Sequence, residues 1–233
     1  MEVRFFLKSR TAFIRMFYEQ ASAPFLETIR LIEDKEPPFV PPYSEDGEPP
    51  FLEEWMEATT GVQVVGQTCV SILSECVRLY FLTWERELGV KCARHFAKDF
   101  KRGYLRGYRT CFEAITEDNW SDSGADLDVI EEVVLVRNAS QHPDSITNME
   151  LAHSISSGRS AADLFFIRDS ERAALSDPDS EWMHFLGVRI YIDRDKLFSA
   201  IDEVEKLTAW LEERFFDAKY PNRRNTSNNG DNA

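Results

Sequence analysis

Cysteine and long apolar runs are both scarce in this chain, and each scarcity excludes a class of protein. The 233 residues contain four cysteines, with no CxxC pair and no histidine at the spacing of a metal site. No metal or other cofactor is therefore expected. The thiols are predicted to be reduced and buried in a cytoplasmic protein: Cys69, Cys76, Cys92 and Cys111. No apolar run approaches the roughly 18 residues of a membrane span, so no membrane partner is expected.

Basic residues are fewer than acidic ones. The chain holds 27 Lys and Arg against 41 Asp and Glu, and its formal net charge is −14. Such a charge repels nucleic acid, but one segment has the opposite sign. Residues 91–109, the basic segment, hold seven basic side chains and one acid, Asp99, so this segment carries +6 and the rest of the chain carries −20.

A helix is predicted over 91–116, with basic side chains on one side and aromatic side chains on the other. Aromatic residues recur at every fourth position, and basic residues occupy the opposite side. Gly103 and Gly107 are expected to loosen the helix and allow a bend. The basic side is either an ordinary solvated surface or a track for RNA phosphates. In the second interpretation the RNA-binding residues are Arg94, Lys98, Lys101, Arg102, Arg106 and Arg109.

Proline is concentrated in one segment. Six of the ten prolines lie within residues 36–50, which are also strongly acidic. Proline removes a backbone donor, so this segment is neither a helix nor a central strand. It is either a stiff surface loop or a polyproline ligand for an aromatic groove on a partner protein.

Apolar residues at three- and four-residue spacing predict an all-α protein, built as an up-and-down helical bundle. The longest repeat covers 62–88 and implies a helix buried along most of its turns. Ser22 with Pro24 is expected to start a second helix or to kink the first, and the run 59–61 is expected to end or bend the helix that contains it. The predicted helices cover residues 3–20, 22–34, 51–59, 62–88, 91–116 and 126–141, and the last helix starts at Asp193 or Asp195 and carries its apolar face to Phe215.

A small β element is predicted between the last two helices. Period-two alternation favours strands at 163–168 and 188–192, joined by an acidic loop into a small β-hairpin insertion. A short helix after Asn148 is expected to contain His153. The predicted organisation is N-terminal helices with the Pro-rich acidic loop packed on the bundle (1–60), the helical domain (61–217) and a disordered tail (218–233).

The segment 126–143 predicts a helix of about four turns. Asp126 or Asp128 can cap its start, and Pro143 is expected to end it near Gln141. Within this helix, an arginine occupies a position where the apolar repeat predicts a residue such as leucine.

That arginine is Arg137, and the predicted helix end frees His142 from helical phase. The imidazole can then turn toward the guanidinium, so that both groups contact one ligand oxygen. Unpaired carbonyls at a helix C-terminus also favour a protonated histidine, which raises its pKa toward neutrality.

The run Arg137-Asn138-x-x-x-His142 resembles the signature of the HEPN superfamily (higher eukaryotes and prokaryotes nucleotide-binding). That signature is an arginine, a polar residue, and a histidine four to six residues after the arginine. The resemblance extends over residues 60–216, because long helices precede the motif and another amphipathic helix follows it. It implies a HEPN-type bundle and a homodimer whose two Arg–His ends form one cleft.

The resemblance also implies a metal-independent endoribonuclease, of the kind that includes toxins and defence enzymes. His142 would take the proton of a ribose 2′-hydroxyl, Arg137 would stabilise the phosphate, and Asn138 would position it. Glu75 is either solvated or orients the Arg137 guanidinium. The alternative is a non-catalytic HEPN-like helical dimer that binds a protein partner, such as an antitoxin, or a nucleotide.

Overall fold

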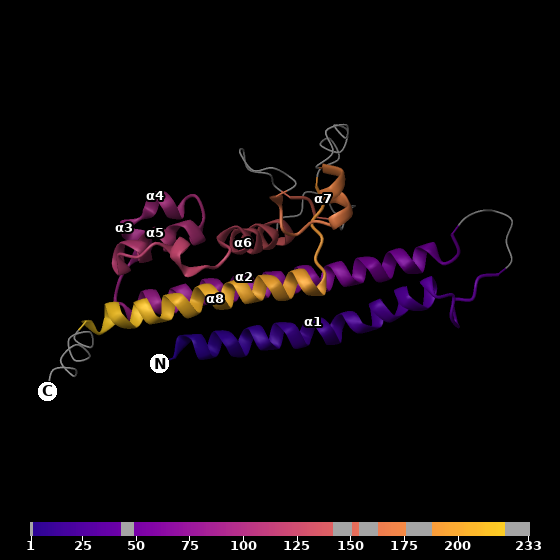
Figure 1. Cartoon of the computed structure of the whole chain (residues 1–233), viewed down its shortest axis with the longest axis horizontal. Coiled ribbons are helices and arrows are strands. Elements are labelled where there is room, and N and C mark those ends of the chain that lie inside the picture. The colour runs from indigo at the N-terminus through magenta and orange to yellow at the C-terminus, as the bar shows by residue number, and fades with distance from the viewer. Residues whose placement is uncertain (1, 43–48, 142–150, 154–162, 176–187, 222–233) are drawn as a thin grey trace. The chain divides into compact units, whose positions relative to one another are not determined.

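The computed structural model describes residues 2–42, 49–141, 151–153, 163–175 and 188–221. Within these residues it contains eight α-helices, which are labelled in Figure 1, and one 3-10 helix, and its β structure is a single isolated bridge. The prediction of an all-α protein is therefore confirmed. None of the helices so described is both long and apolar enough to cross a lipid bilayer.

Contacts divide the chain into two compact units. Unit 1 comprises Met1–Ala12, Leu73–Val134 and Ser199–Ala233, and unit 2 comprises Phe13–Ile72 and Leu135–Phe198. The helices are α1 (Val3–Glu33), α2 (Leu52–Glu87), α3 (Cys92–His95), α4 (Ala97–Phe100), α5 (Tyr104–Thr116), η1 (Trp120–Ser123), α6 (Leu127–Gln141), α7 (Asp169–Leu175) and α8 (Arg194–Lys219). Helices α1, α2, α6 and α8 each contribute residues to both units.

Large aromatic side chains from α2, α5, η1 and α8 form the core of unit 1. The ring of Phe81 is fully buried, and its centroid lies 5.9 Å from that of Phe112 and 5.3 Å from that of Trp120. The Phe112 ring in turn lies 4.7 Å from Phe215. Aromatic pairs of this kind add roughly 0.5–1.5 kcal/mol each beyond the burial of their surface, so they connect these elements firmly.

A buried carboxylate on α8 links three segments of unit 1. Glu212 accepts hydrogen bonds from the Tyr80 hydroxyl and the Trp84 indole N–H, both at 2.9 Å, and from the backbone N–H of Arg4 at 3.2 Å. Burial, together with this carboxylate, raises the pKa of Tyr80 well above its usual range. The start of α1 is therefore fixed by a charge-assisted hydrogen bond rather than by apolar contacts alone.

Two more α8 carboxylates in unit 1 act in the same way. Glu205 accepts from the Thr11 hydroxyl at 2.5 Å, and Glu203 accepts from the backbone N–H of Asp126 at 2.6 Å. With Glu212, they connect α8 to α1 and to the residue before α6 through donors that carry no charge.

For the N-terminal helices the sequence predicts either a division or a bend, and the division is wrong. Helix α1 continues through Pro24, and the Ser22 hydroxyl donates to the carbonyl of Tyr18 at 2.7 Å instead of capping a new helix. Helix α2 continues through Gly61. A Cβ at that position would lie 2.6 Å from the ring of Phe25, so the glycine permits close packing and does not end the helix.

The predicted β-hairpin is wrong for the residues that the structure describes. The segment 188–192 pairs with residues 151–153, through one antiparallel bridge between Ala152 and Arg189. Leu164, Phe166 and Ile167 are all buried. Burial at adjacent positions does not fit a strand with one solvated face.

Two neighbouring predictions also differ from the structure. His153 lies outside any helix, and its Nε2 lies 2.9 Å from the carbonyl oxygen of Phe166. The first part of the predicted acidic loop is helical, because Asp169–Leu175 forms α7.

The prediction of four reduced thiols is wrong for one pair, since Cys92 and Cys111 form a disulfide. Their Cα atoms are 5.6 Å apart, whereas 19 residues of straight helix would separate them by about 28 Å. The single helix predicted over 91–116 is therefore wrong as well: the chain reverses, and Gly103 takes a positive φ of 128° between α4 and α5. Cys69 and Cys76 are free and buried, and burial raises the pKa of both thiols, that of Cys69 to about 12.

Candidate functional site

The start of α6 is capped as the sequence predicts. The Asp126 carboxylate accepts from the backbone N–H groups of Asp128 at 3.0 Å and Val129 at 3.2 Å, which satisfies two of the donors left open at a helix N-terminus. Ile130 and Val133 are buried, in line with the predicted apolar face. Gln141 is the last residue of α6 that the structure describes, so the helix end predicted near Gln141 stays a prediction.

Arg137 and Asn138 lie on the last turns of α6. The Arg137 side chain is half-buried, and its Nη1 donates to the Oδ1 of Asn138 at 3.1 Å, while Asn138 is exposed. The amide therefore holds one edge of the guanidinium at the surface. His142 and Pro143 lie outside the described residues, so the approach of the imidazole to the guanidinium stays a prediction.

Glu75, the predicted orienting residue, contacts an arginine on its own helix. Its carboxylate accepts from Arg78 at 2.8 Å and 2.6 Å, in a two-bond arrangement across one turn of α2. This contact raises the pKa of Arg78 above its usual value. Glu75 belongs to unit 1 and Arg137 to unit 2, and the orientation of Arg137 by Glu75 stays a prediction. The sequence pattern missed Arg78, although its spacing of three residues is a known helix pairing.

The basic segment folds over the second half of α2 in unit 1. Glu85 accepts from the backbone N–H of Cys92 at 2.8 Å and from the hydroxyl of Tyr108 at 2.7 Å, which attaches both α3 and α5 to α2. Gly107 packs against Phe100, and a Cβ there would lie 2.3 Å from that ring. Figure 1 shows α3, α4 and α5 grouped together. Together with the disulfide, these contacts give the segment a defined surface.

The seven basic side chains of this segment fall into two groups. Arg106 pairs with Asp99 at 3.6 Å and Arg109 pairs with Glu113 at 2.9 Å. The other five are exposed and form no ion pair with the described residues: Lys91, Arg94, Lys98, Lys101 and Arg102. Four of the six predicted RNA-binding residues therefore carry a positive charge that no acidic side chain among the described residues neutralises.

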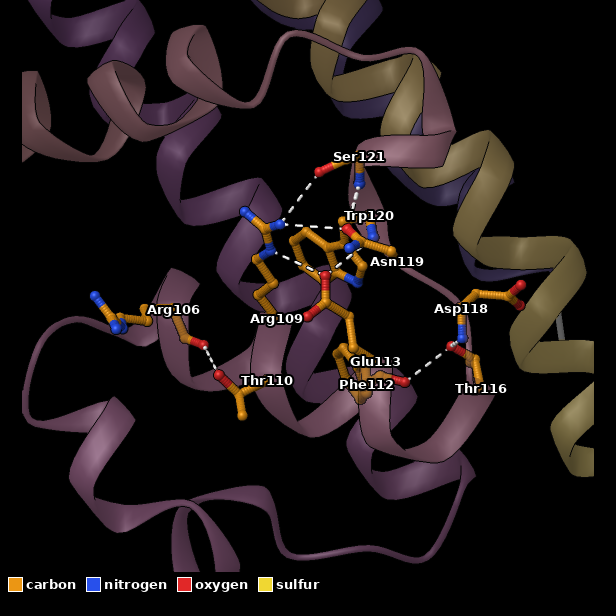
Figure 2. Close-up of polar contacts among 10 residues, drawn as sticks. All are labelled: Arg106, Arg109, Thr110, Phe112, Glu113, Thr116, Asp118, Asn119, Trp120 and Ser121. Carbon is orange, nitrogen blue, oxygen red and sulfur yellow. Dashed lines mark hydrogen bonds and ion pairs between the residues drawn. The ribbon is translucent and has the colours of Figure 1, made fainter.

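Arg109 is part of a local network within the fold. Figure 2 shows its guanidinium directed toward Glu113, Asn119 and Ser121. Besides the ion pair, its Nη2 lies 3.4 Å from both Asn119 Oδ1 and Ser121 Oγ. Glu113 also accepts from the backbone N–H of Trp120 at 3.0 Å. Arg109 thus fixes η1 against α5, a role that the charge pattern did not reveal.

Comparison with family models, with curated proteins and with solved structures finds no match for this chain. Its function is therefore inferred from its own residues and contacts.

Proposed function

We propose that this chain is a metal-independent endoribonuclease of HEPN type that acts as a homodimer. The observation that carries the proposal is the end of α6, where the Arg137 guanidinium lies at the surface against the Asn138 amide. In the sequence, His142 follows the last described residue of this helix. An arginine and a histidine can supply two functions in the cleavage of an RNA phosphodiester, stabilisation of the phosphate charge and proton transfer.

The reaction uses a nucleophile that belongs to the substrate. His142 accepts the proton of a ribose 2′-hydroxyl, the oxygen attacks the adjacent phosphorus, and the bond to the 5′-oxygen of the next nucleotide breaks. Arg137 donates to the phosphoryl oxygens, which gain negative charge in the transition state. A second protonated group must supply a proton to the leaving oxygen, and His142 of a second copy meets this need in a dimer. The product carries a 2′,3′-cyclic phosphate.

The exposed cations of the basic segment support RNA as the substrate. Lys91, Arg94, Lys98, Lys101 and Arg102 form a local positive surface on a chain whose net charge is −14. Phosphate contacts of this kind bind the backbone without reading its sequence.

The test of this function compares substrates that differ at one atom of the ribose. In the presence of EDTA, an RNA oligonucleotide is expected to be cut with a cyclic phosphate product. The same sequence as DNA, or with 2′-O-methyl groups, is expected to stay intact because it lacks the attacking hydroxyl. Cleavage of the DNA, or a requirement for Mg²⁺, would exclude the proposed reaction.

Charge reversal at Lys98 is expected to weaken RNA binding and to reduce its dependence on salt. The loss of one phosphate contact with single-stranded RNA lowers the slope of log K against log salt concentration by roughly 0.7. Fluorescence anisotropy across a salt series measures both quantities for Lys98→Glu. Lys8→Glu is the matched control, since Lys8 is an equally exposed lysine on α1. Equal slopes for the two variants would remove the basic segment from the RNA-binding surface.

A second function has support from a different surface. Helix α1 exposes large apolar side chains, with exposed fractions of 62% for Phe5, 54% for Phe6 and 52% for Phe13. Exposed aromatic residues are typical of protein interfaces. They favour the non-catalytic alternative, a helical dimer that binds a protein partner such as an antitoxin. Under that alternative the RNA oligonucleotide stays intact in the test above.

A further inference from the structure

A small polar pocket lies wholly within unit 2, between α2, α7 and the segment 188–192. Its volume is about 70 Å³. The wall formed by this segment is held firmly: the Gln63 amide donates to the carbonyl of Ile192 at 3.1 Å and accepts from its N–H at 2.9 Å. The backbone N–H of Tyr191 also donates to Phe166 at 2.8 Å. The pocket is therefore preformed.

Two arginines make one part of the pocket lining positive. The guanidinium carbon of Arg168 lies 4.8 Å from the centroid of the Tyr191 ring, a cation–π contact that fixes its position. Arg189 also lines the pocket. Guanidinium groups offer planar pairs of N–H donors, which match the oxygens of a carboxylate or phosphate. The chemistry of this part of the lining therefore fits an anionic group.

The same lining holds two buried polar atoms without a hydrogen-bond partner. They are Oε2 of Glu171 and Oγ1 of Thr59. Buried polar atoms in proteins almost always have partners, and these two belong to residues of the same pocket lining. A carboxylate oxygen only accepts. The ligand must therefore also bring an N–H donor, best of all a positively charged one.

The size of the pocket limits the ligand further. At about 15 Å³ for each water-sized position, the volume holds roughly five such positions. That space suits glycine, alanine or serine, and is too small for a nucleotide, which needs a pocket of several hundred Å³.

We propose that this pocket binds a small free α-amino acid. The ligand carboxylate contacts the guanidinium groups of Arg168 and Arg189, and its ammonium group donates to Glu171 and Thr59. This assignment uses both signs of charge in the pocket lining. It is independent of RNA cleavage, because none of these residues belongs to the α6 motif or to the basic segment.

The experiment is isothermal titration calorimetry of the full chain. The ligands tested are whole amino acids and molecules that carry only one of the two charged groups of an amino acid. Glycine, L-alanine and L-serine are expected to bind. Propionate lacks the ammonium group and ethylammonium lacks the carboxylate, and each is expected to bind at least about tenfold more weakly than alanine, because a charge-assisted hydrogen bond is lost. Inorganic phosphate reports binding through the arginines alone. Alanine no tighter than propionate, phosphate tighter than alanine, or no binding of any amino acid would overturn the proposal.

Isosteric variants locate the binding in this pocket. Glu171→Gln keeps the shape but removes the negative charge, so it is expected to remove the preference for alanine over propionate. Arg168→Gln is expected to weaken alanine and propionate alike. Glu213→Gln on α8, where the glutamate side chain is 83% exposed, is the matched control and should bind as the parent does. Thermal unfolding of each variant checks its folding. A Glu171→Gln protein that is folded and keeps the preference would contradict the assignment.

Discussion

Replacement of His142 with alanine is expected to lower the rate of RNA cleavage by about 10² to 10⁴, the usual contribution of a general acid–base group. The substrate supplies the nucleophile, so removal of the base leaves the 2′-hydroxyl protonated and weakly reactive. The measurement is a single-turnover cleavage rate with saturating protein, which separates chemistry from RNA binding.

Arg137→Lys is expected to lower the rate of RNA cleavage almost as much as His142→Ala does. An ammonium group keeps the charge but cannot form the planar two-bond contact of a guanidinium with phosphate. It also changes the contact with Asn138, which the structure places 3.1 Å from Nη1. Asn138→Ala serves as the graded comparison and should cost less than either change, because it removes a positioning group only.

Two results would contradict this assignment. One is cleavage that persists in His142→Ala, and the other is cleavage that EDTA abolishes and Mg²⁺ restores. Either would place the activity at another site and would favour the protein-binding alternative.

Loss of the Cys92–Cys111 disulfide is expected to lower the free energy of unfolding by about 3 kcal/mol. The bond closes a loop across a sequence separation of 19, and the chain-entropy model gives this value for a loop of that size. For a chain of 150 to 250 residues, such a change lowers the melting temperature by roughly 6 to 12 °C. Calorimetry of the double variant Cys92→Ser, Cys111→Ser against the parent chain measures it.

Reduction supplies the control for this prediction. Dithiothreitol should destabilise the parent chain and leave the double variant unchanged, since Cys69 and Cys76 are already free. Alkylation in denaturant without reductant should label those two thiols, and four after reduction. Four labels without reductant would show that the pair is not bonded in the isolated protein.

The parts of the fold that depend on local sequence were predictable. The Asp126 cap and the extent of α8 follow from side-chain capping and from a regular apolar repeat. Local rules failed where a distant residue decides the outcome. From the sequence alone, Gly61 suggests the end of a helix, whereas in the structure it allows the ring of Phe25 to pack closely. Likewise, no spacing rule indicates that Cys92 pairs with Cys111.

The candidate site was predictable to a similar degree. Charge counting located the basic segment, but it could not separate Lys98, which is exposed, from Arg109, whose charge Glu113 neutralises. The spacing of four residues between Arg109 and Glu113 was the available signal. The amino-acid pocket was out of reach, because Thr59 and Glu171 are brought together only by tertiary packing.

The uncharged donors that the α8 carboxylates bind have a practical consequence for purification. Glu205 and Glu212 accept from hydroxyls or an indole, and mobile ions screen these partly or fully buried bonds far less than they screen exposed ion pairs. Contacts between lysine or arginine and phosphate, in contrast, weaken steeply as salt rises. A concentrated salt wash should therefore strip bound cellular RNA from the chain while unit 1 keeps its fold, and the cleavage assays can begin from nucleic-acid-free protein.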